Sequence, residues 1–148
     1  MALKDRITED MKKAMRSGEK ERLATIRLIL AAIKQREVDE RITLDDSQVL
    51  SAIEKMIKQR KEAIAQFQAG GRADLVAKES AEITVLQTYL PEQLSDAELD
   101  ALIAEAIAST GAASIKDMGK VMGVVKSKAQ GRADMAVVGT RIKQKLSG

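Results

Sequence analysis

The chain has 148 residues, with no cysteine, histidine or tryptophan, one tyrosine, one phenylalanine and one proline. Zinc and iron–sulfur sites, disulfides and catalysis by cysteine or histidine all need side chains that this composition lacks. The aromatic content of 1% also argues against a stacking surface for single-stranded nucleic acid. Lys and Arg number 25 and Asp and Glu 22, so the net charge is only +3. Abundant helix-forming residues indicate a folded helical protein.

The first part of the chain predicts four helices, because apolar residues recur every three or four positions and strand alternation is missing. A loop is expected over 38–46, between the second helix and a third over about 47–69, and a fourth helix over about 75–89. Asp45 or Asp46 is the predicted N-cap of the third helix and Asp74 that of the fourth. The apolar stripes of the first two helices are Leu3, Ile7, Met11 and Met15, and Leu23, Ile26, Leu30 and Ile33.

Four further residues refine this pattern. Leu44, just before the predicted cap, is placed to act as a hydrophobic staple. Gly70 and Gly71 are expected to end the third helix through a left-handed C′ residue. Arg60 interrupts the apolar stripe of that helix, so its side chain either reaches past the apolar surface to solvent or faces a partner.

A boundary is predicted at Pro91, which cannot continue a helix and disfavours helix at the residue before it. Ser95 and Glu98 form a capping-box pattern that starts a fifth helix, which runs to near Gly111. A sixth helix is expected over about 114–129, and a seventh begins after Asp134. The segments 71–75 and 131–135 share the pattern Gly-Arg-Ala-Asp-apolar, which is explained by a C′ glycine followed by an N-capping aspartate, with a duplicated functional site as the alternative.

The charge is concentrated near the C-terminus, where residues 111–148 contain eight basic and two acidic side chains, a net +6, against −3 for residues 1–110. Such a basic segment suits phosphate contacts, since neutralising phosphates releases condensed counterions; a solvated cationic surface is the alternative. Within the sixth predicted helix, Gly119 and Gly123 lie on one face. Either another backbone, including a sugar–phosphate chain, approaches that face closely, or the glycines permit tight helix packing.

Several segments together identify a family. The residues concerned are 27–34, 58–62, 67–75, the segment Tyr89-Leu90-Pro91-Glu92-Gln93-Leu94, the segment 117–123 and 131–134. In this order and spacing they resemble the YqeY family, small bacterial proteins related to the C-terminal tail of the GatB subunit of tRNA-dependent amidotransferase. The resemblance implies an all-α protein of two helical domains, an N-terminal bundle over 1–92 and a three-helix GatB-tail-like domain over 95–148. It implies a tRNA contact in the second domain.

From these observations we expect a non-catalytic tRNA- or RNA-binding accessory protein that needs no cofactor or metal. The predicted nucleic-acid-binding residues are Lys116, Gly119, Lys120, Gly123, Lys126, Lys128, Gly131 and Arg132. Two alternatives stay open: a component of a glutamine-dependent amidotransferase, that is, of a carbon–nitrogen ligase, and an adaptor that binds proteins through Arg27, Lys34 and Arg60. An amidotransferase or another translation-related protein is the expected protein partner, and the sequence leaves the oligomeric state open. No secretory h-region or membrane-spanning stretch is present, so a cytoplasmic protein without membrane contact is expected.

Overall fold

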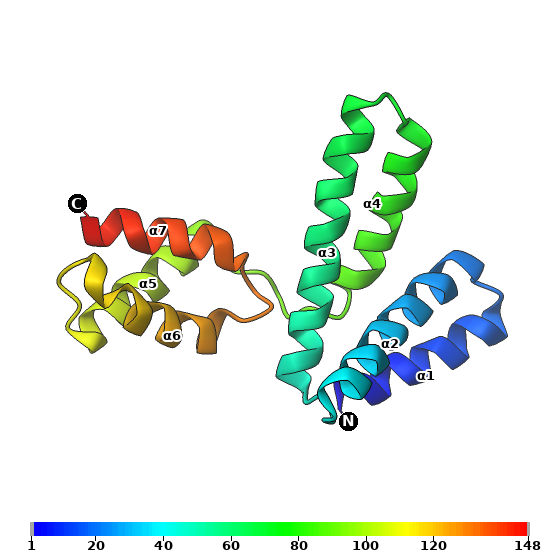
Figure 1. Cartoon of the computed structure of the whole chain (residues 1–148), viewed down its shortest axis with the longest axis horizontal. Coiled ribbons are helices and arrows are strands. Elements are labelled where there is room, and N and C mark those ends of the chain that lie inside the picture. Colours follow the sequence, from blue (N-terminus) through cyan, green and yellow to red (C-terminus); the bar gives the residue numbers. More distant parts are fainter. Residues whose placement is uncertain (1, 148) are drawn as a thin grey trace. The chain divides into compact units, whose positions relative to one another are not determined.

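A computed structural model of the chain describes residues 2–147, and within that range it contains seven α-helices, one short 3₁₀ helix and no strand (Figure 1). The predicted all-α class is therefore confirmed. The chain divides into two compact units, Met1–Leu90 and Pro91–Gly148. Each unit has a hydrophobic core of its own. The assignment of the second unit as a GatB-tail-like domain stays a prediction.

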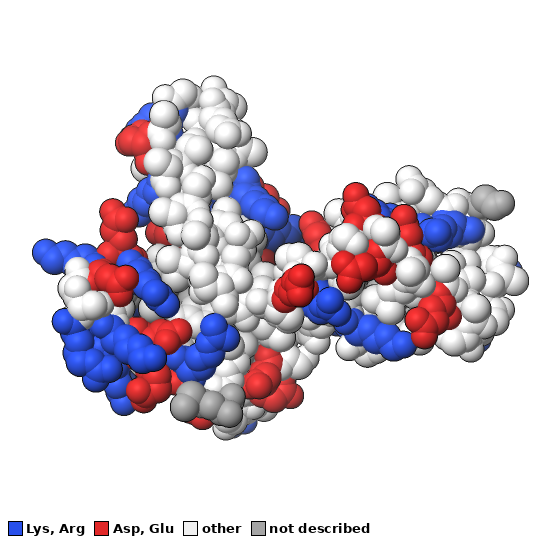
Figure 2. All heavy atoms as spheres, turned by 180° about the vertical axis from the view of Figure 1, so that it is seen from behind, with Lys and Arg blue, Asp and Glu red and all other residues white. Residues whose placement is uncertain are grey.

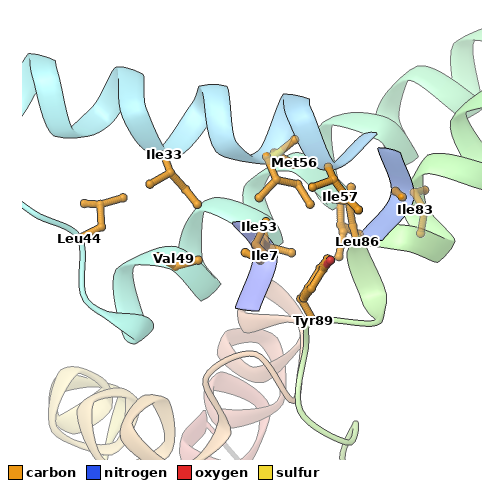
Figure 3. Packing of buried hydrophobic residues seen from close by; sticks show 13 residues of the cluster. Ile7, Ile33, Leu44, Val49, Ile53, Met56, Ile57, Ile83, Leu86 and Tyr89 are labelled. Atoms are coloured by element: carbon orange, nitrogen blue, oxygen red, sulfur yellow. The ribbon is translucent and has the colours of Figure 1, made fainter. Parts of the chain in front are cut away.

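The N-terminal unit consists of two helical hairpins that pack on one another. Its helices are α1 (Leu3–Ser17), α2 (Lys20–Glu40), α3 (Asp46–Ala69) and α4 (Ala73–Gln87). All four contribute to one core, in which isoleucines predominate (Figure 3). The buried residues are Ile7, Ala14, Ile26, Ile29, Ile33, Leu44, Val49, Ile53, Met56, Ile57, Ile83, Leu86 and Tyr89. Met15, which the sequence placed on the core stripe, is instead 50% exposed, because it lies at the edge of the face that Ala14 buries.

The capping residues predicted from the sequence are found at both ends of α3. The Asp45 side chain accepts a hydrogen bond of 2.8 Å from the Gln48 N–H in a capping box, which confirms Asp45 as the N-cap of α3. Leu44 is buried beside it, as a staple requires. Gly71 has φ +69°, and the Arg72 N–H bonds the Phe67 carbonyl at 2.9 Å, so α3 ends in the predicted glycine motif.

Two boundary predictions in this unit are wrong. Helix α2 continues to Glu40, so the loop is shorter than 38–46; the last turn is mostly charged, and its one apolar residue, Val38, is exposed and does not extend the buried stripe. It ends at Arg41, which adopts φ +55° and donates its N–H to the Glu37 carbonyl. Helix α4 begins at Ala73, which leaves Asp74 inside the first turn rather than at the cap. The Arg72 side chain bonds the Asp74 carboxylate there and, with backbone N–H groups, lowers its pKa.

Tyr89, just after α4, contacts two residues of α1. Its hydroxyl donates a 2.7 Å hydrogen bond to Asp10, and the Arg6 guanidinium lies 5.2 Å from the ring centroid. Only 3% of the residue is exposed. Burial first, and then the Asp10 carboxylate, raise the pKa of Tyr89 to about 12. Tyr89, two residues before the predicted boundary at Pro91, therefore belongs to the core of the N-terminal unit.

The C-terminal unit packs three helices around a small core. They are α5 (Asp96–Thr110), α6 (Met118–Ala129) and α7 (Met135–Ser147). The predicted capping box is present, since the Glu98 N–H donates to the Ser95 hydroxyl at 3.1 Å. The predicted helix over 114–129 is interrupted, because its first turn is a 3₁₀ helix, Ile115–Asp117. The buried residues are Leu99, Ile103, Ala106, Val121, Val125, Ala129, Val138 and Ile142.

Candidate nucleic-acid interface

Helix α6 has one buried and one open side. Val121, Val125 and Ala129 are fully buried in the core of the C-terminal unit. Successive residues turn by about 100° around a helix, so Gly119 and Gly123 fall on the opposite side, together with Ser127. All three are exposed. The helix therefore presents bare backbone to its surroundings along two successive turns.

The two glycines do not serve packing within the described chain. A Cβ atom built on Gly119 or Gly123 meets no heavy atom within 4 Å. By contrast, a Cβ on Gly139 in α7 lies 3.7 Å from the Met118 side chain. The alternative of tight helix packing at Gly119 and Gly123 is thus wrong for the described residues. Glycine inside a helix costs about 1 kcal/mol relative to alanine, and no intramolecular contact offsets that cost at Gly123.

Lysines flank the open glycine face. Lys120 and Lys126 lie on either side of Gly123 around the helix, and Lys116 is in the preceding 3₁₀ turn. All three lysines are exposed. Asp117 shapes that turn, because its carboxylate accepts hydrogen bonds from the Ala113 and Ser114 N–H groups at 3.0 and 3.3 Å. These two bonds lower the pKa of Asp117, and Lys120 contributes to the same shift.

The remaining predicted site residues have intramolecular partners. The Arg132 Nε donates to the Glu92 carbonyl at 2.9 Å, and the Arg132 carbonyl accepts from the Leu94 N–H at 2.8 Å. Gly131 is buried, and its carbonyl accepts from the Gln93 side chain at 2.7 Å. The turn after α6 therefore holds the segment before α5 in place within the C-terminal unit. We infer a structural role for Gly131 and Arg132.

Lys128 lies closer to α5, where its Nζ is 3.5 Å from Glu105. Both side chains are more than half exposed, so this ion pair contributes little to stability. Arg141 of α7 pairs with Asp96 at 2.6 Å and Asp100 at 3.1 Å, and these carboxylates raise its pKa above the ordinary value. Gly119, Lys120, Gly123 and Lys126 thus share one side of α6, and the exposed Lys116 lies in the turn that precedes it. We call this set the α6 face.

The two Gly-Arg-Ala-Asp segments serve as helix connections in different ways. Gly71 and Gly131 both adopt a positive φ, at +69° and +75°. Asp134 accepts a 2.9 Å hydrogen bond from the Ala136 N–H, which confirms it as the cap of α7. Asp74 has no such role, as described above. The repeated letters therefore mark two turns with different local contacts.

For Arg60, the sequence left open whether the side chain reaches solvent or faces a partner. Its Nε lies 2.8 Å from Glu82 and 4.0 Å from Glu79 of α4, and its side chain is only 14% exposed. A cation in an apolar stripe was visible in the sequence, but its partners come from the next helix. This placement removes Arg60 from the surface that the adaptor hypothesis assumed. Arg27 and Lys34 remain exposed.

The described residues contain no group of three or more acidic side chains arranged to hold a metal ion. None of the described helices combines the length and apolar character needed to cross a membrane.

Comparison with known proteins decides the family. The family model described as "Yqey-like protein" matches residues 4–146. The chain belongs to the YqeY family. It is also similar to fungal proteins named "Altered inheritance of mitochondria protein 41, mitochondrial". The one from Pyrenophora tritici-repentis is 37% identical over 94% of this chain and 78% of its own length.

Two yeast relatives of the same name match shorter parts. The protein from Lachancea thermotolerans is 37% identical over 66% of this chain, and that from Kluyveromyces lactis is 40% identical over 56%. The chain spans 54% and 45% of the length of these two relatives. The expected cytoplasmic location is wrong on this comparison, because the relatives are named as mitochondrial proteins. Compartment addresses are separate segments that receptors recognise, and the composition of a folded body does not encode them.

Proposed function

We propose that this YqeY-family chain is a non-catalytic accessory protein that binds tRNA or a similarly folded RNA. The observation that supports this proposal is the α6 face, where exposed backbone at Gly119 and Gly123 lies between exposed lysines. The family's relationship to the GatB tail supports tRNA as the class of RNA. An amidotransferase or another translation-related protein is the matching protein partner, and the relatives' names support a mitochondrial setting.

The chemistry of the α6 face suits a sugar–phosphate chain. Folded RNA presents phosphates and 2′-hydroxyl groups along its shallow minor groove, and proteins recognise this shape without base stacking. A missing Cβ lets the RNA backbone approach the helix more closely than any other residue would allow. Lys120 and Lys126 would then reach phosphates on both sides of the approaching strand. The scarcity of aromatic residues does not oppose binding of this kind.

The basic character of the α6 face is local. Helix α6 contains three lysines and no acidic side chain, whereas α5 contains four acidic side chains and no basic one. A phosphate backbone is attracted to α6 and repelled by α5, so binding is oriented. RNA affinity should therefore depend on which helix of the C-terminal unit a charge substitution is made in, and not only on the net charge of that unit.

Binding of tRNA by the full chain, followed by fluorescence anisotropy at several salt concentrations, tests the proposal. The variant K120E/K126E should weaken binding at least about tenfold and reduce the dependence on salt, since two phosphate contacts are lost. The matched control is K143E/K145E on α7, which makes the same charge change at two exposed lysines of the same unit. Equal losses in both variants would show a non-specific charge effect and refute the site. Absence of binding at low salt would refute the function.

A further inference from the structure

The outward side of α2 is a second exposed surface; among its residues, the Arg27 guanidinium makes one long, exposed contact of 3.6 Å to the Met15 sulfur of α1. Leu28 is 45% exposed and Val38 is 64% exposed. These side chains lie opposite the buried Ile26, Ile29 and Ile33, so α2 has apolar residues on both sides. We call the exposed side the α2 face; it consists of Ala24, Arg27, Leu28, Ala31, Lys34 and Val38.

The α2 face has the spacing of a helix-docking surface. Ala24, Ala31 and Val38 follow one another at intervals of seven residues, as do Arg27 and Lys34. A seven-residue repeat keeps the same side chains on one side of a helix over several turns, which is how helices pack along one another. Small residues in the repeat allow close approach of a second helix. The charged members are basic, so they favour a partner helix with acidic side chains.

The chain itself contains a helix with the complementary pattern. The exposed side of α5 has four alanines, at positions 97, 101, 104 and 108. Glu98 and Glu105 lie along the edge of this alanine surface, seven residues apart. Among the described α-helices, α5 alone has acidic side chains and no basic one. We call the set of four alanines and two glutamates the α5 face.

We propose that the α2 face of one copy of this protein docks on the α5 face of a second copy. The spacings match, because two pairs of charges seven residues apart are each separated by about 10.5 Å along their helices. Arg27 and Lys34 pair with Glu98 and Glu105, while the alanines of both helices lie between them. The exposed Leu28 and Val38 are covered in this contact. An RNA partner would leave these apolar side chains against phosphates, so a protein helix is the better occupant.

One helix pair buries less surface than a stable dimer, so the association is expected to be weak. Interfaces of specific dimers bury about 1,200–2,000 Å² in total, and two helices of four turns fall below that range. The expected Kd is therefore micromolar or weaker. The Lys128–Glu105 contact within the chain is long and exposed, and Glu105 can leave it at little cost.

Sedimentation equilibrium of the full chain from about 1 µM to about 1 mM tests the proposal. The native chain should associate reversibly, and R27E/K34E should remain monomeric at all concentrations. The matched control K58E/K61E reverses two exposed lysines of α3 in the same unit and should associate like the native chain. Circular dichroism confirms that each variant is folded.

A charge exchange identifies the contact. E105K should weaken association, and a second substitution should restore it: K34E if the two helices run parallel, R27E if they run antiparallel. Restoration by neither combination would overturn the proposal. So would a native chain that stays monomeric throughout, or self-association that R27E/K34E leaves unchanged. RNA binding through α6 does not enter this measurement, so failure here is distinguishable from failure of the proposed function.

Discussion

Replacing the two exposed glycines of α6 by alanine should stabilise the protein and weaken its RNA binding. A Cβ at either position meets no atom within 4 Å, so neither substitution produces a clash. Gly123 lies in the helix interior, where alanine is favoured by about 1 kcal/mol. Gly119 lies in the first turn, where we expect about half of that gain. The double variant G119A/G123A should therefore gain about 1.5 kcal/mol.

Thermal unfolding measures this gain. For a unit of this size, each kcal/mol raises the Tm by about 4–8 °C, so the double variant should melt roughly 6–12 °C higher. The matched control is Gly111→Ala at the end of α5, where φ is +66° and a Cβ is strained although space is open. That variant should lose about 1 kcal/mol.

The tRNA affinity of G119A/G123A should fall, because the added methyl groups hold the RNA backbone away from the helix while every charge is retained. A melting temperature that is unchanged or lower would refute the assignment of these positions as open helix surface. A higher melting temperature with unchanged tRNA affinity would refute close approach at the α6 face. These two outcomes separate the structural reasoning from the functional reasoning.

Two further predictions concern the N-terminal unit. Glu82→Ala should destabilise the protein by about 1–3 kcal/mol in urea denaturation, because Arg60 is only 14% exposed and loses its 2.8 Å partner. The control is Glu62→Ala, which removes an exposed glutamate. Equal losses of stability in the two variants would contradict the importance of the Arg60–Glu82 ion pair. Tyr89→Phe should cost about 1 kcal/mol through loss of the hydrogen bond to Asp10. The pKa of Tyr89 is raised to about 12 in the folded protein, so its contribution is complete below pH 10 and is lost as pH rises towards 12. Tyr89→Phe should remove that part of the alkaline destabilisation, and identical pH profiles for variant and native chains would contradict it.

The sequence alone was sufficient for the helical class and for most helix ends. The signals that succeeded were short-range ones: the capping boxes at Asp45 and Ser95, the left-handed glycines after α3 and α5, and Asp134 before α7. These act within four or five residues, so one segment contains both partners of each contact. The error at residues 38–40 arose because Val38 lies on the exposed side of α2, away from the buried apolar stripe. The error at Asp74 arose because aspartate is favoured both at the N-cap and in the first turn of a helix.

The candidate site required the tertiary structure. The sequence placed Arg132 with Lys120 as a phosphate contact, which stays a prediction; it gave no sign that the Arg132 Nε donates to the Glu92 carbonyl, 40 residues earlier. Arg60 resembled an exposed or partner-facing cation, but two glutamates on the next helix surround it. Spacing along a helix predicts which residues share a side, and Gly119 and Gly123 were predicted correctly in that respect. Whether that side is buried or open depends on where neighbouring helices pack, and no local pattern contains that information.

The absence of histidine and cysteine and the low aromatic count determined only which chemistries this chain lacks, whereas helix-forming residues and apolar periodicity determined the helical class. Its basic excess after residue 110 was also visible in the sequence. Tertiary packing decided which of those charges are available, because it pairs Arg141 with Asp96 and Asp100, holds Arg132 against the backbone, and leaves Lys116, Lys120 and Lys126 exposed. The physical reason is that a nearby carboxylate offsets part of a cation's field and a hydrogen bond occupies some of its donors, so such a cation attracts an outside phosphate less than an exposed cation without such contacts does.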